Sequence, residues 1–165
     1  MKAIQILATL ILMTLISTSV ASAQRINAFD AGSSIDTARH SVFLELSTGL
    51  VTNSLAINYE YQVEPHISLR LGAGAAVQLE GASEVGGTLG AQFFTAGDSR
   101  FEGGVGASLL YGTSSVIQPS KWTVAPAANI GYRYQPVSGG MMFRVGLSYS
   151  YNYGLPLQGS AGYSF

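Results

Sequence analysis

Cysteine is absent from this chain of 165 residues, and charged residues make up only 10% of it. Without cysteine the chain can form no disulfide, no thiolate metal site and no cysteine nucleophile. The charged fraction is less than half of the roughly 25% that is usual for a soluble domain. A net charge of −1 excludes a basic nucleic-acid-binding protein and a highly charged disordered chain. Since 47% of the residues are hydrophobic, a water-soluble globule is hard to build from this composition.

Long apolar runs are also scarce, and the one at the N-terminus predicts a cleaved signal peptide over residues 1–23. Lys2 supplies the positive start, residues 4–16 form the apolar run, and Ala21-Ser22-Ala23 offers an A-x-A cleavage site. The alternative is an uncleaved anchor helix, although the run is short of the roughly 20 residues that span a membrane. Residues 24–40 are polar and mixed and are predicted to be a leader segment. No later segment predicts a transmembrane helix.

From residue 42 onwards apolar and polar residues alternate, which is the pattern of β-strands. Within 141–153, for example, the odd positions are apolar or aromatic and the even positions are mostly small or polar. The pattern predicts strands at 42–50, 54–63, 67–79, 85–95, 100–111, 122–135, 141–153 and 157–165. Strands of roughly ten residues cross a bilayer when tilted. The predicted fold class is all-β: an eight-stranded antiparallel transmembrane β-barrel over residues 41–165, in an up-and-down meander.

The choice between a soluble and a membrane barrel depends on which face points inward. The polar face is dominated by Gly, Ala and Ser, which suit a narrow interior, whereas large residues occupy nearly every position of the apolar face. An eight-stranded interior is only just wide enough for side chains, so the large residues are expected outside. Arg70, Arg133 and Arg144 lie on the polar face, and facing lipid would cost each of them roughly 2–4 kcal/mol. We therefore predict a barrel whose apolar face contacts outer-membrane lipid.

The outward aromatic residues predict two girdles, one at each membrane interface. With the N-terminus in the periplasm, one girdle consists of Tyr59, Tyr61, Phe93, Phe101, Tyr132, Tyr134, Phe143, Tyr163 and Phe165. The other consists of Tyr111, Trp122, Tyr149, Tyr151 and Tyr153. Periplasmic turns are predicted at 64–66, 97–99 and 136–140, and external loops near 51–54, 80–84, 112–121 and 153–156. Only 112–121 is long enough to present much surface.

Four stretches carry a resemblance to a known family. They read HSVFLEL at 40–46, GYRYQP at 131–136, GGMMFRVG at 139–146 and GYSF at 162–165. Together they resemble the small outer-membrane β-barrels common in Bacteroidota, and the resemblance covers most of 40–165. It implies an OmpA/OmpX-like barrel in the cell outer membrane. Tyr163 and Phe165 are similar to the signal read by the barrel-assembly machinery, which usually has a hydrophobic residue where this chain has Gly159.

The inward charges are predicted to gather in the periplasmic half of the lumen. They are Glu45, Glu60, Arg70, Arg100, Glu102, Arg133 and Arg144. Buried charges need partners, so we expect a paired network that plugs the barrel, tightened by inward Phe43, Phe94 and Met142. Unpaired, the same charges could line an ion path. Glycines in the outer half could line a small pocket, but we expect them mainly to let the strands coil tightly.

Neither catalysis nor metal binding is predicted. The two histidines are far apart: His66 lies in a periplasmic turn, and His40 precedes the first strand. Neither reaches the outer rim, where a base beside a nucleophile would be needed. No cofactor and no ligand is implied. Pro126 lies inside a strand, so a bulge or broken pairing is expected there. The predicted function is a structural or surface-interaction role with a plugged lumen; the alternatives are a narrow pore for small solutes or ions and a surface adhesin.

Overall fold

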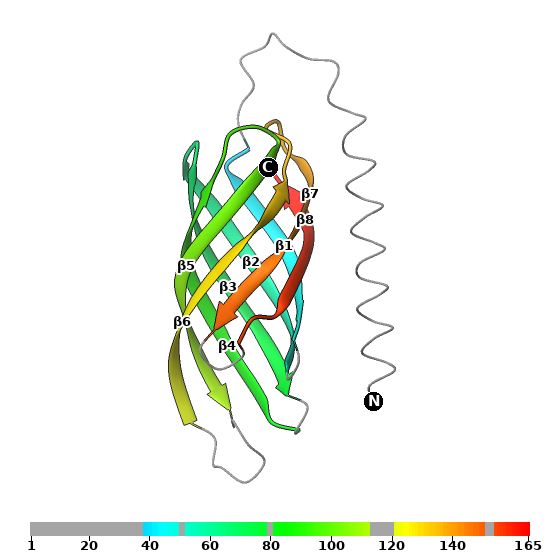
Figure 1. The fold of residues 1–165 in the computed structure, drawn as a ribbon. Helices are drawn as coiled ribbons and strands as arrows, with labels where there is room; N and C mark the ends of the chain where they lie inside the picture. The colour runs from blue at the N-terminus through cyan, green and yellow to red at the C-terminus, as the bar shows by residue number, and fades with distance from the viewer. Residues whose placement is uncertain (1–37, 50–51, 79–80, 113–120, 151–153) are drawn as a thin grey trace, which may run out of the picture. The chain divides into compact units, whose positions relative to one another are not determined.

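The computed structural model describes residues 38–49, 52–78, 81–112, 121–150 and 154–165. These residues form a closed barrel in which each strand pairs with the next and β8 pairs with β1 (Figure 1). The strands are β1 (His40–Thr48), β2 (Thr52–Glu64), β3 (Ile67–Gln78), β4 (Ser83–Phe94), β5 (Ser99–Gly112), β6 (Lys121–Tyr134), β7 (Gly140–Ser150) and β8 (Leu157–Ser164). All the pairings are antiparallel. The predicted fold class, an eight-stranded antiparallel meander barrel, is confirmed.

The two-residue alternation decides which side chains enter the lumen. Leu71 and Leu89 are paired in the β3–β4 ladder and point outward, with 64% of Leu89 exposed. Arg70, one position before Leu71, points inward and is buried. Because successive side chains of a strand point to opposite faces, one register orients a whole strand. The barrel therefore carries its large apolar side chains outside and its charges inside.

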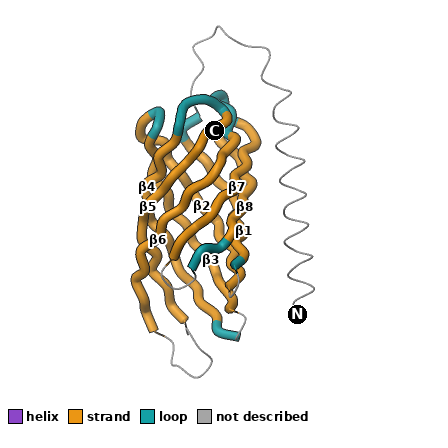
Figure 2. The backbone as a smooth tube through the Cα atoms, viewed as in Figure 1, coloured by secondary structure: helices purple, strands orange, loops and turns teal. Residues whose placement is uncertain are grey.

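The turns between β2 and β3, β4 and β5, and β6 and β7 lie at one end of the barrel, together with the start of β1 and the end of β8 (Figure 2). We call this the terminus end and the other the loop end. Gly97, Gly139 and Gly140 have positive φ in two of these turns, a backbone conformation that glycine adopts without steric cost. The Val137 and Gln135 amides donate to Asp98 and so join the two turns.

Most strand limits differ from the predicted ones by one to three residues, and two of these shifts change the predicted place of a residue. His40 belongs to β1 instead of preceding it, because it exchanges two backbone hydrogen bonds with Phe165 and its ring stacks on that of Phe165. β4 begins at Ser83, which moves Glu84 from a predicted loop into the barrel wall. Pro126 keeps its register with Ala107 of β5 without a bulge, whereas the described pairs of β6 with β7 begin only at Ala127, so among the described residues the pairing on that side stops at the proline, the other outcome expected there. Each strand residue directs its N–H to one neighbour only, so a proline removes a bond on one side alone.

Within the parts of the chain that the structure describes, no helix is long and apolar enough to cross a membrane.

Candidate functional site

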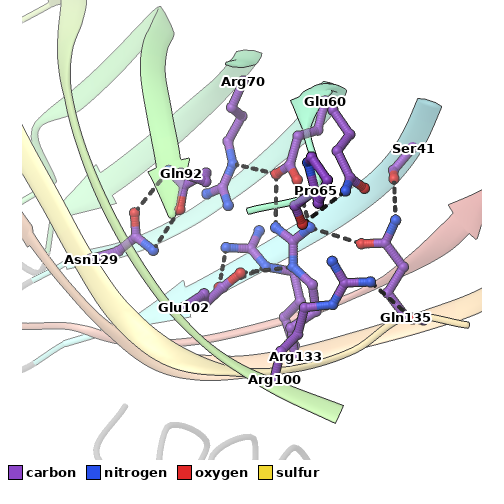
Figure 3. Close-up of polar contacts among 12 residues, drawn as sticks. Ser41, Glu60, Pro65, Arg70, Gln92, Arg100, Glu102, Asn129, Arg133 and Gln135 are labelled. Atoms are coloured by element: carbon purple, nitrogen blue, oxygen red, sulfur yellow. Dashed lines mark hydrogen bonds and ion pairs between the residues drawn. The ribbon is translucent and has the colours of Figure 1, made fainter. Parts of the chain in front are cut away.

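The candidate site is a ring of ion pairs across the lumen, in the terminus half of the barrel. Figure 3 labels four of its members, Glu60, Arg70, Glu102 and Arg133. Six strands each supply one member: Glu45 from β1, Glu60 from β2, Arg70 from β3, Glu102 from β5, Arg133 from β6 and Arg144 from β7. Acid and base alternate around the ring, and the last member returns to the first. Three carboxylates and three guanidinium groups give the ring no net charge.

Arg133 is the centre of this ion-pair ring and is completely buried (0% exposed). Its Nη1 and Nη2 donate to the two oxygens of Glu60 at 2.5 and 2.8 Å. Its Nε donates to Glu102 Oε2 at 2.7 Å, and Nη1 also donates to Gln135 Oε1 at 2.8 Å. A planar guanidinium suits this arrangement, because it can donate two parallel hydrogen bonds to one carboxylate and a further hydrogen bond to a second carboxylate.

The other two arginines of the ring close it through Glu45. Arg144 Nε donates to Glu102 Oε1 at 2.8 Å, and its Nη1 lies 3.4 Å from Glu45 Oε2. Arg70 Nε donates to Glu60 Oε2 at 3.2 Å, and its Nη1 lies 3.8 Å from the same Glu45 oxygen. Glu45 is the most exposed member, so its two ion pairs are the longer and weaker ones. The closed ring joins strands on opposite sides of the lumen.

Arg100 does not join the ring, although the sequence grouped it with the other six charges. Its Nη2 donates to the Gln135 carbonyl oxygen at 3.4 Å, and among the described residues it has no ion pair. It lies nearer the terminus end and lines a cavity of about 310 Å³ there, together with turn residues that include His66. The residue points inward as predicted, but it lies among the turn residues of the terminus end instead of in the ring.

Aromatic rings lie against the guanidinium groups. Phe43 faces Arg70 and Arg144, with centroid distances of 5.3 and 4.8 Å. Phe94 faces Arg100 and Arg133 at 5.2 and 4.7 Å. Cations are attracted to an aromatic face within about 6 Å of its centroid, so these rings stabilise the charges that they cover. Phe43 and Phe94 are buried, as is Met142, and all three point inward as the sequence predicted.

Sequence reasoning missed two buried polar side chains. Gln135 accepts a hydrogen bond from Arg133 and donates one to Ser41 Oγ at 3.2 Å. Its position on the inner face of the predicted strand could have indicated that it contacts the lumen charges. Glu84 points into the lumen near the loop end and is 6% exposed. Residues 80–84 were predicted as loop, although Glu84 is in phase with the inward face of the following strand.

Between the ring and Glu84 lies a cavity of about 170 Å³. Along one wall of it, Gln92 of β4 and Asn129 of β6 form two reciprocal amide hydrogen bonds of 3.1 and 3.0 Å over Gly104 of the intervening β5. A methyl group added at Gly74 would lie 2.5 Å from the Leu55 carbonyl oxygen, and one at Gly90 would lie 2.9 Å from that of Val105. These glycines therefore allow close strand packing, the role expected of them, while the lumen between them stays open.

The outward aromatic residues lie in two groups near the strand ends. Most of the described girdle residues are exposed, namely Tyr59, Tyr61, Phe93, Phe101, Tyr111, Trp122, Tyr149, Tyr163 and Phe165, and Tyr132 and Phe143 are half-buried. Tyr134 differs: it is only 9% exposed at the end of β6, where the adjoining turn is held to Asp98. Tyr151 and Tyr153 lie outside the described residues, as do the cleavage-site residues Ala21 and Ala23.

Histidine and carboxylate side chains do not assemble into a metal site in the described part of the chain, where no group of three such residues could hold a metal ion. His40 Nδ1 hydrogen-bonds the Tyr59 hydroxyl at 2.7 Å. His66 Nδ1 lies 3.1 Å from the Phe94 carbonyl oxygen. Each histidine is engaged locally, one on the outer face and one in a turn.

Comparison with known proteins gives a likeness of fold. No protein-family model and no curated protein sequence matches the chain. Among solved structures, the N-terminal β-barrel domain of Pseudomonas aeruginosa OprF matches with a TM-score of 0.60 and 12% identity, over 78% of this chain and 98% of that one. The Yersinia pestis outer membrane protein Ail, determined in a phospholipid bilayer nanodisc, matches with a TM-score of 0.53 and 15% identity, over 78% of this chain and 99% of that one. The chain therefore has the fold of the small eight-stranded barrels of the outer membrane.

Proposed function

We propose that this protein is an integral outer-membrane barrel with a structural or surface-interaction role, whose lumen is closed by the ion-pair ring. The closed ring is the observation that carries the proposal. Glu60 and Glu102 each have both oxygens engaged by arginines. Charges paired in this way are costly to separate, so a passing ion would have to break several short contacts.

The outward face supports a position in lipid. Large apolar side chains such as Leu71, Leu89 and Ile130 are mostly exposed, and a soluble protein rarely exposes a contiguous apolar surface of this extent. The fold shared with OprF and Ail supports the outer membrane in particular. Export by a signal peptide cleaved after Ala23, and assembly through Tyr163 and Phe165 by the barrel-assembly machinery, complete the proposal. Membership of the Bacteroidota barrels and the absence of enzymatic activity stay predictions.

A planar-bilayer experiment separates this proposal from the narrow pore. The purified, folded protein is expected to give no stable single-channel steps. Steps that persist in the folded wild-type protein and disappear when the lumen is filled, as in Ala127→Leu, would establish the pore instead. A heat-modifiability gel on cell fractions tests the location, because a protein that stays in the soluble periplasmic fraction, or does not shift on boiling, is no membrane barrel.

The adhesin hypothesis rests on residues 113–120, which lie outside the described residues. Ail is described as an attachment invasion locus protein, but the likeness to it is one of fold. Deleting 113–120 and measuring binding to host-cell or matrix surfaces tests this alternative; unchanged binding would remove it.

A further inference from the structure

The lumen cavity of about 170 Å³ on the loop side of the ion-pair ring has the size of a ligand site. Its polar lining includes Glu45, Asn58, Arg70, Glu84, Gln92 and Asn129. A buried cavity of about 150 Å³ can hold a benzene molecule, so this one has room for a compact organic molecule. Much of the remaining lining is Gly and Ala together with Leu110, which would contact an apolar body.

Two buried donors at the ring end of this cavity have no hydrogen-bond partner among the described residues. They are Arg70 Nη2 and Asn58 Nδ2, on residues that are 8% and 3% exposed. The other nitrogens of Arg70 face Glu60 and Glu45. A buried donor is unfavourable unless an acceptor meets it, so these two groups specify what the cavity would bind.

The two donors lie in adjacent rows of the barrel wall. Glu60 pairs with Arg70 and Asn58 pairs with Gly72, so the rows are two residues apart, or about 7 Å along the strands. A methyl group at Gly72 would overlap the Asn58 amide, lying 2.6 Å from Thr88 Oγ1 as well. Glycine at this position therefore leaves the space that the Asn58 amide occupies.

The charged residues of the lining, Glu45, Arg70 and Glu84, allow at most one negative charge on the ligand, and that charge belongs at Arg70, the only basic residue among the described residues that line this cavity. Arg100 lies on the other side of the ring, where it lines the cavity at the terminus end. At the other end of the cavity, Glu84 Oε2 is also without a partner. Glu84 pairs with Ala76, six residues along β3 from Arg70, which is about 20 Å. That distance leaves room for an anion at Arg70, while Glu84 disfavours further negative charge.

We propose that this cavity binds a small monocarboxylate, whose carboxylate accepts hydrogen bonds from Arg70 and Asn58 and whose short apolar part lies among the Gly and Ala residues. A carboxylate offers several acceptor positions, so one group can satisfy both donors. An inorganic ion would satisfy the donors but leave the apolar part of the cavity unfilled. The site is independent of whether the barrel conducts, because it lies in the outer half of the lumen, beyond the ring.

The test titrates butyrate into the folded, full-length protein in detergent micelles and follows backbone amide NMR shifts. Saturable shifts at Asn58, Gly72 and neighbouring lumen residues are expected. Butan-1-ol, which has a similar apolar part without the charge, is expected to bind at least tenfold more weakly. Chloride alone should not saturate the same shifts. Butyrate that fails to saturate in the tens of millimolar range, or butan-1-ol or chloride that binds as well, overturns the proposal.

Three variants test the position of the site, each first checked for folding by its shift on heating. Asn58→Ala removes one donor and should weaken butyrate binding about tenfold, the loss of one charge-assisted hydrogen bond. Ala127→Leu fills the cavity wall and should abolish binding. Ser68→Ala is the matched control, because Ser68 is also buried and inward-facing but does not line the cavity. Unchanged affinity in Ala127→Leu, or a loss in Ser68→Ala equal to that in Asn58→Ala, refutes the assigned site.

Discussion

Replacing Arg133 by methionine tests whether the ion-pair ring holds the barrel together. Arg133 donates four hydrogen bonds, three of them to carboxylate oxygens of Glu60 and Glu102. In the variant each carboxylate keeps only one arginine, and both remain buried. Removing one partner of a buried ion pair typically costs about 3–5 kcal/mol. We therefore expect Arg133→Met to lower the free energy of unfolding by about that amount.

Arg100→Met is the matched control. Arg100 is also a buried arginine and is the register partner of Arg133, but its one hydrogen bond is a 3.4 Å contact with a carbonyl oxygen. Its removal leaves no buried carboxylate without a partner, and it relieves the electrostatic repulsion between Arg100 and Arg133. We expect a loss of less than about 1 kcal/mol, in the range of an ordinary hydrogen bond.

Reversible urea unfolding from lipid vesicles measures both variants. Trp122 is the single tryptophan of the chain and lies exposed on the outer face of β6, so its fluorescence reports transfer from lipid to water. The reasoning is refuted if Arg133→Met unfolds within about 1 kcal/mol of the wild-type protein. It is equally refuted if Arg100→Met is as destabilising, because burial of a long side chain would then explain both losses without the ring.

Four further variants test the outer face, the packing and the assembly signal. Leu89→Arg should cost about 2–4 kcal/mol in the same assay, because Leu89 is mostly exposed where the barrel faces lipid; a neutral result would contradict the lipid-facing assignment. Gly162→Ala should cost about 1–3 kcal/mol by overpacking, since the added methyl would lie 2.5 Å from the Phe43 Cα, whereas Gly103→Ala has 3.8 Å of clearance and should be nearly neutral. Phe165→Ala should reduce the heat-modifiable fraction in cell envelopes without preventing refolding in detergent, and normal assembly in cells would argue against Phe165 as a signal.

The alternation of residues was enough to predict the fold and the inward direction of all seven lumen charges. It could not predict their partners. Glu60 and Arg133 are 73 positions apart on strands that do not pair, so their contact depends on barrel closure. The different position of Arg100 depends on the same geometry. Glu84 was missed because a strand limit shifted by two residues, and limits of this kind depend on cross-strand pairing that a local pattern does not contain.

The ring of six charges from six strands has a consequence for strand register. Alternation repeats every two residues, so a two-residue slip of one strand leaves its apolar side chains in lipid and its polar side chains inside. The same slip would move that strand's charge about 7 Å along the barrel and leave its two neighbours in the ring facing empty positions. The ion pairs thus favour one register among several that bury the same apolar surface in lipid. Because the ring is complete only when every contributing strand has its correct register, barrel closure would depend on the alignment of strands as distant as β2 and β6.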